Sequence, residues 1–157
     1  VNDFLSLLFC SPFLFFFFVN QMSIEERIKD ATKQVVLSFQ PTFVQTMDRM
    51  RHRMGAFYRP TSTLVWNGEL ISGADSIAAF YNTLPITNTV FTTFDVQPLV
   101  INRPDIEPVC ATMLITATGH VEYDGSNARS FGETFVLRLD PSTRTWFIQS
   151  DCFRLDT

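Results

Sequence analysis

Residues 146–155 read WFIQSDCFRL. Side chains alternate between the two faces of a sheet along a strand. Here both faces receive apolar residues: Phe147, Phe153 and Leu155 on one, and Trp146, Ile148 and Cys152 on the other. A strand with one face in solvent alternates apolar with polar residues instead. This stretch therefore predicts a strand that is buried on both faces.

Arg154 is a cation set among these apolar residues. Strand alternation places it on the face of Trp146, Ile148, Ser150 and Cys152. One interpretation is an arginine in a subunit interface, whose planar guanidinium binds a partner carboxylate with two hydrogen bonds. The other is an arginine that extends to solvent at the sheet edge. The sequence leaves both interpretations open.

Strands fill the second half of the chain. They are predicted over 87–101, 108–122, 130–139 and 144–154, separated by the turn-forming stretches NRPDIEP, YDGSN and DPST. The strand over 108–122 has an apolar side and a side that is partly polar but hardly charged. The first side holds Met113, Ile115, Ala117 and Val121, and the second holds Thr112, Leu114, Thr116, Thr118 and His120.

Helical patterns precede these strands. Apolar residues recur at steps of three and four from Ile24 to Met47, as in an amphipathic helix. Ser23 and Glu26 match the capping box that opens such a helix, and Pro41 is expected to kink or break it. The run DRMRHRMGAFY predicts a short second helix with a solvated basic face, or alternatively a patch for RNA or an acidic partner: Arg49, Arg51, His52 and Arg53.

A hairpin and a third helix lie between these segments. Residues 63–66 resemble a strand, and Asn67-Gly68 is typical of a type I′ hairpin turn. The stretch SGADSIAAFYNTLP predicts a helix with a capping box of Ser72 and Asp75 that ends at Pro85. Its expected buried face consists of Ile77, Phe80, Tyr81 and Leu84. Helices followed by strands indicate an α+β fold, with helices on one antiparallel sheet.

Three short helices can cover only one face of such a sheet. Because both faces of the last strand are apolar, the other face is expected to bind a second subunit. The alternative is a sheet that curls enough to cover both of its own faces.

The composition sets broad limits on function. The chain has 157 residues, a net charge of −4 and a pI of about 5.0, which suits one domain without the basic footprint of a nucleic-acid-binding protein. Its three cysteines, Cys10, Cys110 and Cys152, are scattered and form no CxxC. This disfavours a disulfide framework or a zinc site and fits a reducing compartment.

Residues 1–21, VNDFLSLLFCSPFLFFFFVNQ, differ from the rest of the chain. They hold 7 of the 17 phenylalanines and a single charged residue, Asp3. The apolar run contains Pro12, is shorter than the roughly 20 residues that span a bilayer, and has no basic segment before it. We expect that this extension is not native and that the domain occupies residues 22–157, beginning at Met22. A membrane anchor is the alternative.

Three motifs in this order resemble the nuclear transport factor 2-like superfamily, and within it the small NTF2-related export proteins. They are TSTLVWNG (61–68), ISGADSIAAFYNTLP (71–85) and SDCFR (150–154), and MDRMRHRMGAFY (47–58) is similar as well. The resemblance covers about residues 23–156. It implies a cone-shaped α+β fold with three helices on a strongly bent antiparallel sheet. The extension has no counterpart in the family, and Pro41 falls where the family normally has a continuous helix, so a kink is expected there.

The resemblance also implies a function. It implies the non-catalytic subunit of a heterodimeric mRNA export receptor, paired with the matching domain of a Tap-like nuclear RNA export factor. Such a pair shuttles between nucleus and cytoplasm, contacts nucleoporins and reaches RNA only indirectly, without a membrane, metal or cofactor. The open sheet face is the dimer surface of the superfamily, so Cys152 and Arg154 fall on interface positions. Asp151 and Phe153 fall on the inward side.

Two other functions are compatible with the same fold. One is a homodimeric carrier of the GDP-bound Ran GTPase, which would use carboxylates such as Asp105 and Glu107 at a pocket rim. The other is an isomerase or dehydratase, which needs buried acids or a His–Asp pair in a cavity. His52 and His120, with Asp95, Asp151 and Tyr123 as possible partners, form no evident cluster in the sequence. We therefore expect no enzymatic activity.

Overall fold

A six-stranded mixed sheet forms the body of the protein, in the order β2-β1-β6-β5-β4-β3. The computed structural model describes residues 23–99 and 112–156. The strands are β1 (Tyr58–Trp66), β2 (Glu69–Ser72), β3 (Thr87–Pro98), β4 (Thr112–Tyr123), β5 (Arg129–Leu139) and β6 (Trp146–Leu155). The expected α+β fold is confirmed. The sheet is not wholly antiparallel, however, because β1 and β6 run parallel.

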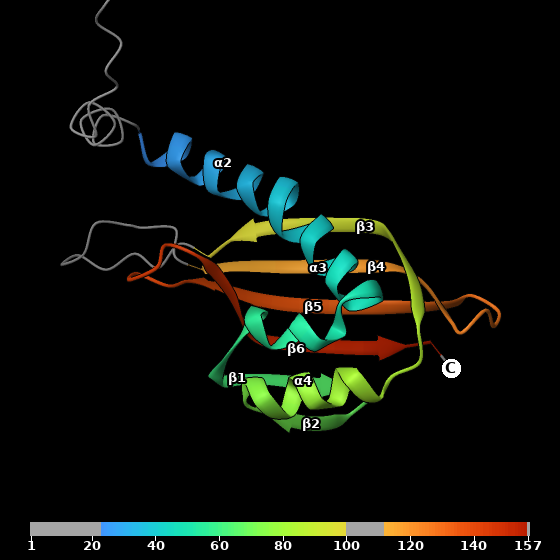
Figure 1. Cartoon of the computed structure of the whole chain (residues 1–157). Coiled ribbons are helices and arrows are strands. Elements are labelled where there is room, and N and C mark those ends of the chain that lie inside the picture. Colours follow the sequence, from blue (N-terminus) through green and yellow to red (C-terminus); the bar gives the residue numbers. More distant parts are fainter. Residues whose placement is uncertain (1–22, 100–111, 157) are drawn as a thin grey trace, which may run out of the picture.

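The helices cover one face of this sheet (Figure 1). They are α2 (Ile24–Gln34), a π-helical turn (Val35–Phe39), α3 (Gln40–Arg49), a 3₁₀ helix (Arg51–Phe57) and α4 (Ala74–Thr83). In Figure 1, α4 lies in front of β1 and β2, and α3 lies in front of the other half of the sheet. The expected second helix is thus a 3₁₀ helix. The extension 1–21 and the residues Asp105 and Glu107 lie outside the described residues.

The first helix is continued past Pro41 rather than broken by it. Proline has no N–H for the carbonyl four residues back and its ring collides with that carbonyl. Here the π turn precedes it, and the N–H of Gln40 reaches the Val35 carbonyl five residues back. Pro41 then stands in the first turn of α3, where an N–H is not needed. The expected capping box at the start of α2 is confirmed, with Ser23 and Glu26 bonded reciprocally.

The hairpin between β1 and β2 is confirmed, and the cap of α4 differs from the prediction. Asn67 and Gly68 have φ of 52° and 95°, as a type I′ turn requires. Ser72 does not cap α4, because it pairs with Thr63 at the end of β2. The N-cap residue is Gly73, with φ of 87° and no side-chain hydrogen bond.

The core lies between the helices and the concave face of the sheet. Val35, Phe39, Phe43 and Met47 of the amphipathic stripe are buried, as expected. Ile77 and Tyr81 of α4 are also fully buried, while Phe80 and Leu84 are partly buried against the core. Strand β4 alternates as predicted, with Met113, Ile115, Ala117 and Val121 inside. A second cluster at the end of the sheet contains Val121, Phe131 and Phe153, with the Trp66 ring stacked on Phe153 at 3.9 Å.

Candidate functional site

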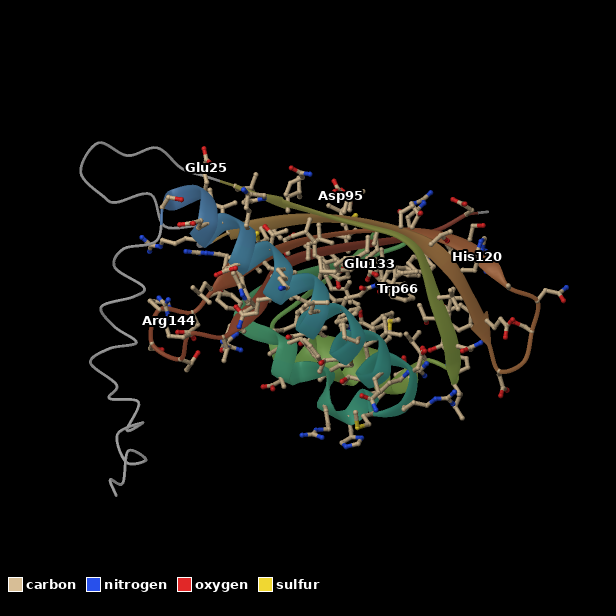
Figure 2. All side chains as sticks on the ribbon, turned by 90° about the horizontal axis from the view of Figure 1, so that it is seen from above. Glu25, Trp66, Asp95, His120, Glu133 and Arg144 are labelled. Carbon is tan, nitrogen blue, oxygen red and sulfur yellow. The ribbon has the colours of Figure 1, made fainter. Side chains whose placement is uncertain are left out.

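The face of the sheet that is turned away from the helices is covered by no element of the described chain (Figure 2). We call it the open face. Asp95 and His120 point outward on this side, whereas Trp66 and Glu133 point between the sheet and the helices. The strand registers place the following residues on it: Leu70, Thr63, Val65, Phe147, Ser150, Cys152, Arg154, Thr134, Val136, Leu114, Thr116, Asp95 and Gln97.

This face is largely apolar and hydroxyl-rich, and its charged side chains are spread over different strands: Asp95 on β3, Glu122 on β4, Arg138 on β5 and Arg154 on β6. Leu70 is 65% exposed, and Val65, Leu114 and Val136 are half-buried between neighbouring strands. Thr63, Thr116, Thr134 and Ser150 add hydroxyl groups between them. Such a composition is typical of a surface that another protein covers, where charged residues are depleted.

A β-bulge changes which residues of β6 reach the open face. Val136 pairs with Ser150 and Leu137 with Ile148, so Gln149 is an extra residue in β6. An extra residue reverses the alternation of side chains along the strand. The expected interface set is therefore corrected: Ser150, Cys152 and Arg154 lie on the open face.

Trp146 and Ile148 lie on the core side of β6 instead. Ile148 is fully buried, and Trp146 packs against the core. The sequence-based alternation placed Phe147 with the core, but it lies on the open face, where the Arg59 guanidinium is 4.9 Å from its ring centroid. Arg59 also contacts Asp140 at 3.6 Å. Hydrogen bonds from Ser142 lower the pKa of Asp140 to about 2.

Arg154 is exposed and has no ion-pair or hydrogen-bond partner among the residues that the structure describes. It lines a surface groove of about 250 Å³ together with Asn67, Arg129 and Leu155. A guanidinium in this position is available to a carboxylate from outside. The interface role of Arg154, Cys152 and Ser150 remains a prediction.

A buried acidic cluster that was not predicted from the sequence lies on the opposite side of β6. Asp151 and Glu133 are 0% and 2% exposed. They are diagonal neighbours on the core face, since Asp151 pairs with Phe135 and Glu133 with Phe153. The Tyr58 hydroxyl donates to Asp151 Oδ2 at 2.7 Å and lies 3.3 Å from the Tyr81 hydroxyl. The alternation Phe131, Glu133, Phe135, Leu137 was the available signal for an inward-facing Glu133.

Both carboxyl groups hold a proton more tightly than an exposed carboxyl group does. Burial raises the pKa of Asp151 to about 7, although the hydrogen bond from Tyr58 opposes this. Burial first, and the charge of Asp151 second, raise the pKa of Glu133 well above its ordinary range. Burial also raises the pKa of Tyr58 and of Tyr81, so both phenols stay neutral at physiological pH.

Both acids are enclosed by the surrounding side chains, as their exposures of 0% and 2% show. A nearby cavity between Arg51, Trp66, Tyr123 and Phe153 has a volume of about 10 Å³, which is room for about one water molecule. Aromatic, aliphatic and methionine side chains pack the rest of the interior. The histidines supply no catalytic pair, because His120 bonds Ser130 at 3.3 Å on the open face and His52 is exposed.

The basic segment 49–53 is divided by the fold. Arg51 is committed to structure, donating from Nη2 to Thr87 at 2.8 Å and from Nη1 to the Leu84 carbonyl, whereas its neighbours Arg49, His52 and Arg53 are exposed. Among the described residues there is no group of three potential metal ligands. No helix in the described ranges is long and apolar enough to cross a membrane.

Comparison with known proteins places this fold in a family. Residues 35–155 match the model of the nuclear transport factor 2 (NTF2) domain. NTF2-related export protein 1 from Bos taurus is 35% identical over 74% of this chain and 82% of its own length. NTF2-related export protein 2 from Homo sapiens is 32% identical over 71% and 78%.

A solved structure agrees with this assignment at the level of the fold. Nuclear transport factor 2 from Cryptosporidium parvum superposes with a TM-score of 0.67, at 23% identity, over 80% of this chain and 94% of its own. The matched residues 35–155 include the curved sheet, the π turn before Pro41 and both faces of β6. The chain therefore belongs to the nuclear transport factor 2 domain family.

Proposed function

We propose that this chain is the non-catalytic subunit of a heterodimeric mRNA export receptor. It pairs through the open face with the matching domain of a Tap-like nuclear RNA export factor and stabilises that domain during passage through nuclear pores. The pair shuttles between nucleus and cytoplasm, contacts nucleoporins, and reaches RNA only indirectly. The similarity to proteins named NTF2-related export proteins supports a role in nuclear export.

The open face is the observation that carries this proposal. It combines Leu70 at 65% exposure with weakly polar strand residues and the exposed guanidinium of Arg154, which has no partner among the described residues. Burying apolar surface contributes about 25 cal/mol per Å², and a desolvated guanidinium–carboxylate pair adds orientation and selectivity. A second domain with the same curved sheet and an acidic residue opposite Arg154 fits this surface.

The interior supports a non-catalytic role. An enzyme of this fold would need its acids to line a cavity that admits substrate. Glu133 and Asp151 are instead enclosed by Tyr58, Tyr81 and the packed core of the domain. The nearby 10 Å³ cavity is too small for an organic substrate.

The test is binding of the Tap-like domain by wild type and by Arg154→Glu, measured by calorimetry. Removing one member of a buried charge pair costs about 2–5 kcal/mol, so charge reversal is expected to weaken binding by roughly thirty-fold or more. Arg53→Glu is the matched control, because Arg53 is exposed on the helical side. The circular dichroism of both variants should equal that of wild type.

Two results would count against the proposal. Arg154→Glu binding at wild-type affinity would show that Arg154 only extends to solvent. Capture of Ran–GDP by the purified chain, without binding of the export factor domain, would favour the homodimeric carrier instead.

A compensating substitution gives a positive test. Reversing the charge of the partner's facing acid is expected to restore part of the affinity that Arg154→Glu loses.

A further inference from the structure

The interior of the cone contains two carboxyl groups with no compensating cation among the described residues. Neither oxygen of Glu133 nor Oδ1 of Asp151 has a hydrogen-bond partner in the described structure. A buried polar atom without a partner is costly, and an ionised one far more so. The two side chains are diagonal neighbours on adjacent strands, close enough to influence each other's charge.

The groups facing this pair come from every layer around it. Tyr58 of β1 donates to Asp151, and Tyr81 of α4 lies beside Tyr58. Tyr123 of β4 is a further titratable neighbour of Glu133, whereas Cys152 of β6 lies on the opposite, open face. All of these groups are neutral or acidic. The cluster therefore has donors for one carboxylate, through Tyr58, but no positive charge to balance two.

We propose that Glu133 and Asp151 act as a proton-sharing pair, and that losing the shared proton loosens the β5–β6 pairing that presents the open face. With one proton, Glu133 donates its O–H toward Asp151 Oδ1 while Tyr58 donates to Oδ2, and the orphaned oxygen of Asp151 is satisfied. Without the proton, two like charges face each other in a dry core. The strands must then separate or admit water.

The position of the pair connects it to the partner surface. Asp151 lies between Ser150 and Cys152, which are on the open face, and Glu133 lies between Gly132 and Thr134, which pair with Arg154 and Cys152. Any shift of β5 against β6 therefore displaces the residues around Arg154. The proposed effect of the Glu133–Asp151 pair on β5 and β6 does not depend on the identity of the partner. It can therefore be tested on the isolated chain.

The pH dependence has a definite sign. The pKa of Asp151 is raised to about 7 and that of Glu133 is raised well above its ordinary value. A folded state that binds more protons than the unfolded state loses stability as pH rises. The loss begins above the unfolded pKa values of about 4 and continues through the folded ones. Each extra proton held by the folded state makes the unfolding equilibrium constant rise about tenfold per pH unit.

The experiment is urea unfolding of the full chain from pH 5 to pH 8.5, for wild type, Glu133→Gln and the exposed control Glu69→Gln. Glutamine keeps the shape and can donate to Asp151 without a proton to lose. With one titrating group fewer, the unfolding equilibrium constant of Glu133→Gln is expected to rise less steeply with pH than that of wild type, by a factor of about ten per pH unit. Glu133→Gln should therefore be the more stable protein at pH 8.5. Glu69→Gln should follow wild type.

A second measurement reports the pair itself. In wild type, hydrogen-exchange protection of β5 and β6 amides should fall between pH 6.5 and 8.5 more than that of β3, and in Glu133→Gln it should not. If Glu133→Gln does not fold, Asp151→Asn serves the same comparison. Wild-type stability that stays constant or rises from pH 5 to 8.5 would overturn the proposal. So would an equal pH dependence of wild type and the folded variant.

Discussion

Gly119 allows β3, β4 and β5 to approach each other where the sheet bends, and adding one methyl group there tests the fold. It pairs with Phe91 on one side and Phe131 on the other, beside an irregularity in the β3–β4 register between Phe91 and Thr93. A Cβ at this position would lie 2.2 Å from the Val90 carbonyl oxygen and 2.9 Å from the Phe131 ring. Gly119→Ala therefore cannot be accommodated without moving backbone.

The magnitude follows from these distances. Restoring an acceptable contact of about 3.0 Å means moving the Val90 carbonyl away from its present 2.2 Å separation, which disturbs the ladder beside the bulge. Overpacking a core typically costs about 1–3 kcal/mol, and a backbone collision belongs at the upper end. For a domain of this size, 1 kcal/mol shifts the melting temperature by about 4 °C. We expect Gly119→Ala to melt about 10 °C below wild type.

The neighbouring strand offers a matched control. A Cβ on Gly132 of β5 would meet nothing within 4 Å, so Gly132→Ala should melt within about 2 °C of wild type, or slightly higher because alanine restricts the unfolded chain. Thermal melts followed by circular dichroism make the comparison. If the two alanine variants melted at the same temperature, the close approach of β3 to β4 at Gly119 would be wrong.

Two further substitutions test other parts of the structure. Asp48→Ala removes the acceptor of Thr87 and Thr89, whose three hydrogen bonds of 2.6–3.0 Å attach α3 to β3. The free energy of unfolding, measured in urea, is expected to fall by about 2–3 kcal/mol. A fall of less than about 0.5 kcal/mol would show that this attachment is unimportant. Ile148→Ala should lower the free energy of unfolding by about 2–5 kcal/mol, whereas Cys152→Ala should change it by less than about 0.5 kcal/mol. A larger loss for Cys152→Ala than for Ile148→Ala would contradict the bulge at Gln149.

Local signals in the sequence predicted much of the fold. The capping box of Ser23 and Glu26 and the hairpin at Asn67-Gly68 each depend on residues only a few positions apart. The stripe from Val35 to Met47 and the alternation along β4 depend on short-range periodicity, and both are buried as predicted. Such features depend on residues that are close together in the chain, so they can be predicted from the sequence alone.

Features set by distant contacts were not predicted. The parallel pairing of β1 with β6 joins Thr63 to Ser150, and no turn signal connects strands so far apart in the chain. Ser72 matches a helix cap in sequence, but its pairing with Thr63 commits it to β2. The π turn that accommodates Pro41 is likewise a response of the backbone to packing, since it buries Val35 and Phe39 on the same side as Phe43.

The bulge at Gln149 is the feature that joins the core and the open face. With strict alternation along β6, Ile148 would lie on the same face as Cys152 and Arg154. Asp151 would then lie on the same face as Phe147. One inserted residue separates these sets: Ile148, Asp151 and Phe153 turn inward, while Phe147, Ser150, Cys152 and Arg154 turn outward. Bulges commonly redirect side chains at functional sites. Here the irregularity turns Ile148 to the same side as Asp151 and Glu133, and turns Phe147 to the same side as Arg154. The packing of the core and the composition of the open face therefore both depend on one strand.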